Sequence, residues 1–513
     1  MNERVISPLN RVEGDLDLKV IFEGRKVVKA YPMSRLFRGI EVILKGKYPM
    51  DSLVITPRIC GICGGSHLLS AAKSLDMAYG AKVPPNAVRL RNVLTLAEMG
   101  QNDVRHTYLM FMIDSVNRKY EKLPFYRDMV LRWAPYVGTS YKQAVVWSKR
   151  YAEIYAIFGG QWPHGSAMVP GGITAEPFPN DVVKAKGIIR QITAEFLERT
   201  VLGGPLDQFL ELESVEDLEQ WAKDYPEGDV SKVWNYGQSM GWHRIGKGSQ
   251  FLMSYGHVNV PEDYDPANSR EKLVFSRGIL DLNSWDRFEV DPNNVLEFVA
   301  HSFYTYDLGD RIGLNPFMGQ TNPLPPNGKG KYTFTKTFRY KLKDRYVAPE
   351  VGALSMLVVA GNRLMTDLVK RFGTNVLARE VARFVRLALI HELILNNLDT
   401  YDFNGPTYIK PQERQFAMGY GLVEASRGSL GHWIVVEDGK IENYQVVTPT
   451  QINMGPEDPE GNPSHLTMAL VGTEVEDLSN PIEVAHVVRS HDACMVCNVH
   501  VLDGGKEKLA MRL

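Results

Sequence analysis

Apolar and polar residues alternate along the first 35 residues of the chain. The stretch from Leu16 to Met33 contains two such runs, and they are separated at Glu23-Gly24, where glycine favours a turn. Alternation with a period of two is typical of strands that bury one face. The pattern therefore predicts a hairpin or small sheet over residues 1–35.

Helical spacing dominates much of the remaining chain. Apolar residues three and four positions apart predict long helices over residues 84–117, 181–203 and 374–400. The first of these opens with a proline, which is tolerated at a helix start because the first-turn amides have no intrahelical partner. The other two carry apolar residues on more than one face, which indicates central helices of a bundle.

The other segments are less regular. Residues 310–350 are rich in glycine, proline and aromatic residues and are expected to form an irregular excursion with short strands. Residues 430–480 return to a strand-and-turn pattern, with a short helix near 463–471. There is no internal repeat. We expect an α+β fold that is predominantly helical, with a central bundle of long helices, a small N-terminal β-sheet and peripheral β segments.

Composition narrows the range of partners. The 513 residues are 44% hydrophobic, enough for a large core, and 58 basic residues against 60 acidic residues give a formal net charge of −2. That balance argues against a general role in neutralising phosphates, so nucleic acid is not an expected partner. No apolar run reaches the roughly 18 residues that span a bilayer, and the charged N-terminal segment has no signal-peptide core.

The four cysteines form two Cys-x-x-Cys pairs, Cys60/Cys63 and Cys494/Cys497. Four thiolates can hold one transition metal, and the paired spacing suits a reducing compartment better than a disulfide scaffold. A structural zinc site is the simplest alternative, although zinc ribbons place their two pairs tens of residues apart rather than 434. A dithiol redox pair lacks its βαβ setting, and an Fe–S cluster is chemically allowed.

Seven sequence blocks surround these cysteines and occur in a fixed order. They are RVEG at Arg11–Gly14, FRGIE at Phe37–Glu41, RICGICGGSH at Arg58–His67, PHGSAMVPGG at Pro163–Gly172, EVGAL at Glu350–Leu354, EASRGSLGHW at Glu424–Trp433 and DACMVCNVH at Asp492–His500. In these blocks the chain resembles, along nearly its full length, the large catalytic subunit of nickel-iron hydrogenases, most of all the uptake type.

The resemblance implies a buried Ni–Fe centre at which H2 is oxidised reversibly to protons and electrons. By position, Cys60 and Cys494 correspond to terminal nickel ligands, and Cys63 and Cys497 to thiolates that bridge nickel and iron. Soft thiolate donors suit that chemistry. The family's iron also carries cyanide and carbon monoxide, which maturation proteins must supply.

The resemblance also assigns roles to residues beside the metals. Cys494 would accept the first proton and Glu13 the next; from sequence alone, Glu13 is more simply a salt-bridge partner of Arg11 or a solvated strand residue. Arg427 corresponds to a guanidinium that overhangs the open metal site, where it polarises H2 or anchors a cyanide. His67 and Asp492 correspond to residues that contact the ligands without binding metal.

A magnesium site is implied as well. Glu41 and His500 correspond to its ligands, with a backbone carbonyl near Val446 as a further one. Three positions depart from the family pattern: Ala493 and Ser426 replace frequent prolines, and Asn102 stands where some relatives have an acidic residue. These changes leave the four thiolates intact but alter the surroundings of Arg427.

The resemblance makes residues 1–513 a single hydrogenase large-subunit domain. Within it we expect an N-terminal β segment with the first ligand motif (1–60), a helical core (61–310 and 350–430), the irregular excursion (311–349), a C-terminal segment with the second ligand motif (431–500) and a tail (501–513). In most of the family an endopeptidase removes the residues that follow the position of His500. We expect either that an endopeptidase removes residues 501–513 or that the chain retains them.

All four cysteines are committed to nickel, so no cysteine remains for an electron-carrying Fe–S relay. The obligate partner is therefore expected to be an Fe–S small subunit. We expect the complex to be cytoplasmic, with association with the membrane only through partners, or to be exported beside a signal-bearing small subunit. Two rival classes of protein remain open. One is a related subunit of a proton-pumping complex, which lacks the nickel cysteines; the other is a non-catalytic, zinc-stabilised scaffold subunit of a redox complex.

Overall fold

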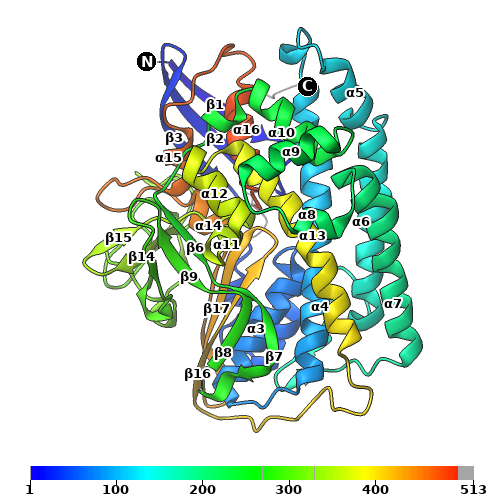
Figure 1. The fold of residues 1–513 in the computed structure, drawn as a ribbon. Coiled ribbons are helices and arrows are strands. Elements are labelled where there is room, and N and C mark those ends of the chain that lie inside the picture. The colour runs from blue at the N-terminus through cyan, green and yellow to red at the C-terminus, as the bar shows by residue number, and fades with distance from the viewer. Residues whose placement is uncertain (1, 15, 269, 329, 495–513) are drawn as a thin grey trace.

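The computed structural model describes residues 2–14, 16–268, 270–328 and 330–494. Helices line one side of the molecule and small sheets the other (Figure 1). A single hydrophobic cluster of buried side chains includes residues from Ile6 to Ala493. Of the described helices, none is long and apolar enough to cross a membrane.

The described α-helices range from four to 24 residues. They are α1 (Ile40–Leu44), α2 (Ser52–Ile55), α3 (Gly64–Tyr79), α4 (Pro85–Arg105), α5 (Tyr126–Trp133), α6 (Thr139–Gly159), α7 (Pro179–Ile192), α8 (Leu206–Leu210), α9 (Val215–Asp224), α10 (Asp229–Ser239), α11 (Ala353–Val359), α12 (Arg363–Phe372), α13 (Val376–Asp399), α14 (Pro449–Met454), α15 (His465–Leu470) and α16 (Ile482–Ser490).

The described strands are short and belong to small antiparallel sheets. They are β1 (Asn2–Leu9), β2 (Leu16–Glu23), β3 (Lys26–Ser34), β4 (Met168–Val169), β5 (Gly172–Ile173), β6 (Phe251–Ser254), β7 (His257–Asp265), β8 (Arg270–Phe275), β9 (Gly278–Asp281), β10 (Arg287–Phe288), β11 (Val295–Phe298), β12 (Tyr304–Thr305), β13 (Asn322–Pro323), β14 (Thr337–Leu342), β15 (Arg345–Val347), β16 (Ala417–Ala425), β17 (Gly428–Glu437) and β18 (Lys440–Val447).

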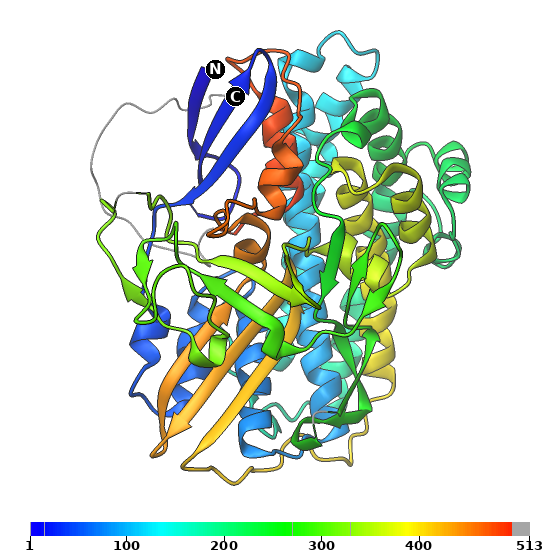
Figure 2. The same ribbon diagram turned by 90° about the vertical axis from the view of Figure 1, so that its left-hand side faces the viewer.

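The N-terminal sheet is confirmed. Strands β1, β2 and β3 pair in that order, and the alternating residues Leu16, Leu18 and Val20 are buried. The chain reverses direction directly after Glu23, as the glycine signal predicts. The sheet lies beside α16, which leads into the second cysteine motif (Figure 2). The fold thus brings the two ends of the chain together.

The predicted bundle is also confirmed. Helix α4 packs against α6 and α13, and α7 packs against both α6 and α13 (Figure 1). The predicted helix over 84–117 is α4, followed by a π-helical turn, η3 (His106–Phe111), and a 3₁₀ turn, η4 (Met112–Val116). A π-helical segment, η6 (Thr193–Leu202), likewise continues α7. Short π segments of this kind occur often at functional sites.

The helical core predicted over 61–310 is wrong at residues 251–305, which form strands β6 to β12. The same holds for β16 at the end of the predicted 350–430 core. These strands bond to distant partners, and some, such as β9, are buried on both faces and so show no alternation. Such segments carry little local signal. The predictions for 311–349 and for 431–480 are confirmed by β13 to β15, β17, β18 and α15.

Helix α3 lies directly on the β16–β18 sheet (Figure 2). Glycines make this close approach possible: a Cβ added at Gly421 would lie 1.9 Å from the carbonyl oxygen of Ser70, and one at Gly419 2.1 Å from that of Ser74. The Ser70 hydroxyl donates to the Gly421 carbonyl at 2.7 Å. Because α3 follows the first cysteine motif and Arg427 lies between β16 and β17, this packing joins two of the predicted site elements.

Candidate metal centre

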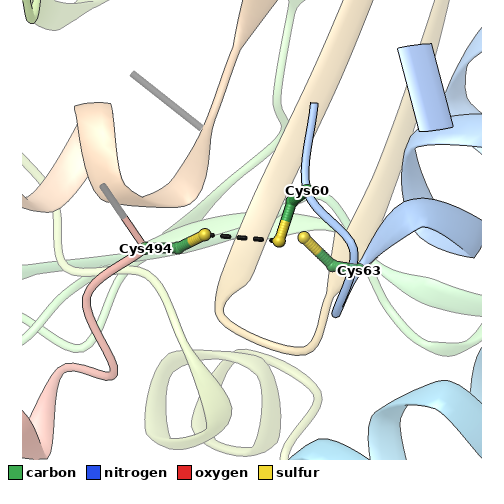
Figure 3. Close-up of side chains that lie close together, drawn as sticks. All are labelled: Cys60, Cys63 and Cys494. Atoms are coloured by element: carbon green, nitrogen blue, oxygen red, sulfur yellow. Dashed lines mark hydrogen bonds between the residues drawn. The ribbon is translucent and has the colours of Figure 1, made fainter. Parts of the chain in front are cut away.

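Three of the predicted ligands meet in the interior. The Sγ atoms of Cys60, Cys63 and Cys494 all lie within 4.8 Å of one another, and each residue is at most 2% exposed. Their side chains point toward a common space (Figure 3). The Cys60 and Cys494 sulfurs are 3.4 Å apart, too far for the roughly 2.05 Å bond of a disulfide. The fourth predicted ligand, Cys497, lies outside the described residues.

Different elements hold the two motifs. Cys60 lies in the loop between a 3₁₀ turn, η2 (Thr56–Arg58), and α3, and Cys63 is the N-cap residue of α3. Cys494 follows α16, and its amide donates to the Thr450 hydroxyl at 2.9 Å. The Glu13 segment runs parallel to the Cys494 segment, and the Glu13 amide donates to the Ala493 carbonyl at 3.2 Å. The predicted proton acceptor therefore lies beside a predicted ligand.

Arg427 lies close enough to the three cysteines for their charges to act on it. Its Nε donates to Asp492 Oδ1 at 3.0 Å, whereas Nη1 and Nη2 are buried without a hydrogen-bond partner among the described residues. Burial alone lowers the pKa of Arg427, but Asp492 and the three thiolates raise it well above its ordinary value. An unpaired buried donor costs about 1–3 kcal/mol. The two Nη groups thus suit acceptors held at the sulfur cluster.

Asp492 holds the Arg427 side chain in place. Besides Arg427, it accepts a hydrogen bond from Asn102 Nδ2 at 2.8 Å, and it lies 3.2 Å from His106 Nδ1 on η3. Burial raises the pKa of Asp492, but Arg427 and His106 together hold it below its usual range. Asn102, the departure noted in the sequence, is therefore a neutral donor to Asp492, and Asp492 stays ionised.

His67 contacts the sheet beneath the site. Its Nδ1 lies 3.0 Å from Nε2 of His432, whose Nδ1 lies 2.7 Å from the hydroxyl of Tyr444. Burial lowers the pKa of His67 to about 4, so the ring is neutral at physiological pH. The predicted hydrogen bond from His67 to a ligand sulfur stays a prediction.

Glu13 is not paired with Arg11. Arg11 binds Asp114, and Arg489 of α16 binds the same fully buried carboxylate. Arg489 also donates to the Asn10 carbonyl at 3.1 Å. These contacts, here called the Arg11–Asp114–Arg489 clamp, tie the loop before Glu13 to α16. Burial and the Cys60 thiolate raise the pKa of Glu13 against the lowering effect of Arg427. A raised pKa suits a carboxylate that takes up and releases protons.

Glu41, the predicted magnesium ligand, lies beside a cavity of about 70 Å³, and its role as a ligand stays a prediction. Its Oε1 accepts from the Val446 amide at 2.9 Å. The backbone carbonyl near Val446 as a magnesium ligand stays a prediction. Lys336 Nζ lies 3.4 Å from Glu41 and 3.5 Å from Glu297. The two carboxylates offer oxygen ligands of the kind a hard cation prefers, and the Lys336 ammonium occupies part of that space in this structure. The other predicted ligand, His500, lies outside the described residues.

Several contacting residues were missed by the sequence reasoning. His106 and His432 gave no signal of their own, although His432 belongs to the block that contains Arg427. His164, in PHGSAMVPGG, has its Nδ1 3.1 Å from the Pro57 carbonyl, and its ring packs over Gly61, 3.8 Å from where a Cβ would be. It is partly exposed, so it connects the ligand loop to the surface.

A second group of potential ligands consists of Glu350, His465 and His491, all buried. The two imidazole Nε2 atoms are 2.8 Å apart, and Arg379 donates to both oxygens of Glu350 at 2.7 and 3.0 Å. These short contacts are those of a hydrogen-bonded cluster. Because a guanidinium within it opposes a further cation, this group is a structural network.

Comparisons with known proteins agree with this geometry. A family model described as nickel-dependent hydrogenase matches residues 38–120 and 136–500. The chain is 28% identical to the uptake hydrogenase large subunit of Bradyrhizobium diazoefficiens, over 99% of this chain and 96% of that protein. It is 30% identical to the periplasmic [NiFeSe] hydrogenase large subunit of Desulfomicrobium baculatum, over 97% and 94%.

Solved structures are similar over the same extent. The Ni-Fe-Se hydrogenase of D. vulgaris Hildenborough in the reduced state matches with a TM-score of 0.80 and 28% identity, over 97% of this chain and 100% of that one. The reduced, active form of the enzyme from Desulfomicrobium baculatum matches with a TM-score of 0.82 at 28% identity, over 97% and 100%. The resemblance therefore extends to the whole fold.

Proposed function

The chain belongs to the nickel-dependent hydrogenase family, and on that premise we propose that it is the catalytic subunit of a hydrogenase that oxidises H2. The observation that carries this proposal is the meeting of three buried thiols, from motifs 434 positions apart, near an arginine whose two Nη groups have no hydrogen-bond partner among the described residues. A zinc-stabilised scaffold would have no need of that cation. The scaffold alternative is therefore not favoured.

Cys60, Cys63 and Cys494, with Cys497 as the fourth, are the residues that would hold the Ni–Fe centre. The sequence has cysteine at all four positions. Soft sulfur donors fit nickel and iron. When bound, such a centre supplies the site at which H2 is split. Cyanide and carbon monoxide on the iron, and the maturation proteins that attach them, belong to the proposal by the family resemblance.

Proton handling falls to Cys494 and Glu13. The backbone pairing of their two segments keeps Glu13 beside Cys494, and the Arg11–Asp114–Arg489 clamp holds that loop in place. The raised pKa of Glu13 allows its carboxylate to hold a proton received from the Cys494 sulfur and to pass it toward solvent. Proton exit by this route is the proposed role of Glu13.

Arg427 is proposed to orient and polarise H2 at the metal centre. Asp492 fixes its Nε, so the two Nη groups stay directed at the sulfur cluster rather than rotating into solvent. A preorganised cation of this kind stabilises charge that develops during reaction, because no reorganisation is needed at that moment. His106 and Asn102 act through Asp492 and are positioning residues.

A small subunit is the partner that large-subunit relatives imply. We propose that it carries Fe–S clusters, because this chain has no cysteine beyond the four at the nickel site. His164 supports a path for electrons out of the site, since its ring packs over the loop between Cys60 and Cys63 and reaches the surface.

Further parts of the proposal rest on the resemblance. A magnesium ion is proposed at Glu41, supported by the Glu41 and Glu297 carboxylates that line this cavity, with His500 as a second ligand. An endopeptidase is proposed to act after the position of His500. A cytoplasmic complex is the proposed location, and cell fractionation with an antibody to the chain tests it against export.

Dye reduction under H2 tests the proposed activity. The purified two-subunit complex is expected to reduce a viologen dye with H2 as the sole donor, and the Cys494→Ser variant is expected to lose that activity, because a harder ligand and weaker base replaces the thiolate. A native complex that contains zinc alone and reduces no dye would restore the scaffold reading.

A further inference from the structure

Glu98 is a buried carboxylate that has no part in the function described above. It lies on α4 and is 1% exposed. Its side chain faces the start of α3, the helix that follows directly after Cys60 and Cys63. Carboxylates are rarely buried this completely unless they are bound by partners. The partners of Glu98 therefore indicate its role.

Glu98 accepts three hydrogen bonds from the first turn of α3. Its Oε2 accepts from the Gly65 amide at 2.6 Å, and its Oε1 accepts from the Ser66 amide at 2.9 Å and from the Ser66 hydroxyl at 2.7 Å. The first amides of a helix have no intrahelical partner and are normally bound by the N-cap side chain. Here Glu98 supplies that cap from a neighbouring helix.

The N-cap residue itself is Cys63, and its side chain makes no capping hydrogen bond. Because Glu98 satisfies the Gly65 and Ser66 amides, α3 starts at Cys63 without drawing on the Cys63 sulfur. Gly65 is fitted to this arrangement: a Cβ at that position would lie 2.8 Å from Glu98 Oε2 and 2.9 Å from the Tyr155 hydroxyl.

Glu98 also brings charge to this position. The N-terminus of a helix carries roughly half a positive charge, which would otherwise stabilise electron-rich sulfur at Cys63 and weaken its donation. Burial raises the pKa of Glu98 to about 7, against the hydrogen bonds of Ser66 and Gly65, which lower it. Cys60 also raises it, so the Glu98 carboxylate and the Cys60 thiolate repel each other. Above pH 8 the carboxylate is ionised.

We propose that Glu98 is a positioning residue that caps α3 and, when ionised, places a negative charge behind the Cys60–Cys63 loop, where it raises the electron density of the metal centre. This inference rests on the proposed function, since it requires the metals to be bound at the thiolates. It adds a residue from α4 to a site otherwise built from the two cysteine motifs, the Glu13 loop and the Arg427 turn.

Glu98→Gln removes the charge at nearly constant volume. In the two-subunit complex at pH 8.5, its metal-bound carbonyl and cyanide stretches are expected at higher wavenumber than in the wild type, because less electron density reaches the iron-bound ligands. The nickel reduction potential, followed by electron paramagnetic resonance, is expected to shift to a more positive value. Ser66→Ala is the matched control: it removes one hydrogen bond to Glu98 but keeps the charge, so the bands are expected to stay in place.

The outcomes separate this inference from the proposed function. A wild-type complex without such bands contradicts the function itself. Wild-type bands that stay at the same position in Glu98→Gln, or that shift equally in Ser66→Ala, overturn the role of Glu98. If Glu98→Gln binds no metal, Glu98→Asp is the deciding variant, because it keeps the negative charge but moves it one methylene further from α3. A small shift of the infrared bands to higher wavenumber supports the inference. Unshifted bands or loss of metal overturn it.

Discussion

Replacement of Arg427 by lysine separates the charge of this residue from its geometry. The guanidinium is buried and bound to Asp492 through Nε, and its two Nη groups have no hydrogen-bond partner among the described residues. Lysine keeps the positive charge but has a single nitrogen. If that nitrogen stays with Asp492, both directed Nη interactions are lost.

The structure sets the size of the effect. Hydrogen bonds to charged groups contribute about 1.5–3 kcal/mol each, so two lost interactions correspond to about 3–6 kcal/mol. At about 1.4 kcal/mol per tenfold change in rate, kcat is expected to fall by about 10²- to 10⁴-fold. The assay is H2-dependent reduction of a viologen dye by the purified complex, with infrared spectra to establish that the centre is loaded.

Arg339 offers a matched control. Its Nε also binds a buried carboxylate at 3.0 Å, that of Asp458, but its Nη groups are bound by backbone carbonyls. Arg339→Lys is therefore expected to lower thermal stability and to leave kcat within about threefold of the wild-type value. A loaded Arg427→Lys complex with kcat in that same range would refute the role of the two Nη groups.

Four other substitutions test separate parts of the site. Glu13→Gln is expected to keep both metals but to slow exchange of D2 with solvent protons by about 10²- to 10⁴-fold, and unchanged exchange would remove Glu13 from the proton path. Asp114→Asn leaves two arginines without their carboxylate and is expected to cost about 3–5 kcal/mol, so an unchanged unfolding temperature would contradict the clamp. Glu41→Gln is expected to reduce magnesium in elemental analysis while nickel and iron stay constant; unchanged magnesium would exclude Glu41 as a ligand. Burial raises the pKa of Glu424 to about 7, so the native state loses stability as pH rises from about 4.5 to 7. At pH 8, Glu424→Gln is therefore expected to increase the free energy of unfolding by up to about 3 kcal/mol and to raise the unfolding temperature. A lower unfolding temperature would show that ionised Glu424 is favourable.

The long helices and the N-terminal sheet were predictable because their patterns are local. Helix α13 buries residues on every side, and its continuous apolar character is visible in the sequence alone. The strands over 251–305 were not predictable in this way. Their pairing depends on distant partners, as when β6 bonds to β9 and to the Glu350 segment. Tertiary context decides such segments.

The meeting of Cys60, Cys63 and Cys494 was predictable because cysteine spacing and the seven blocks mark these residues as candidate ligands. Their polar surroundings depend on contacts that no spacing encodes. Sequence alone suggested Arg11 as a partner of Glu13, whereas the fold pairs Arg11 with Asp114, 103 positions away. Glu98 likewise gains meaning only when α4 lies against the start of α3. Local motifs thus predict the ligands, and packing determines what tunes them.

Elemental analysis of the native complex, combined with infrared spectroscopy in the region of metal-bound cyanide and carbonyl stretches, tests the central claim most directly. The account predicts nickel and iron at about one each per large subunit, together with those bands. Zinc alone, with no band in that region, would contradict it.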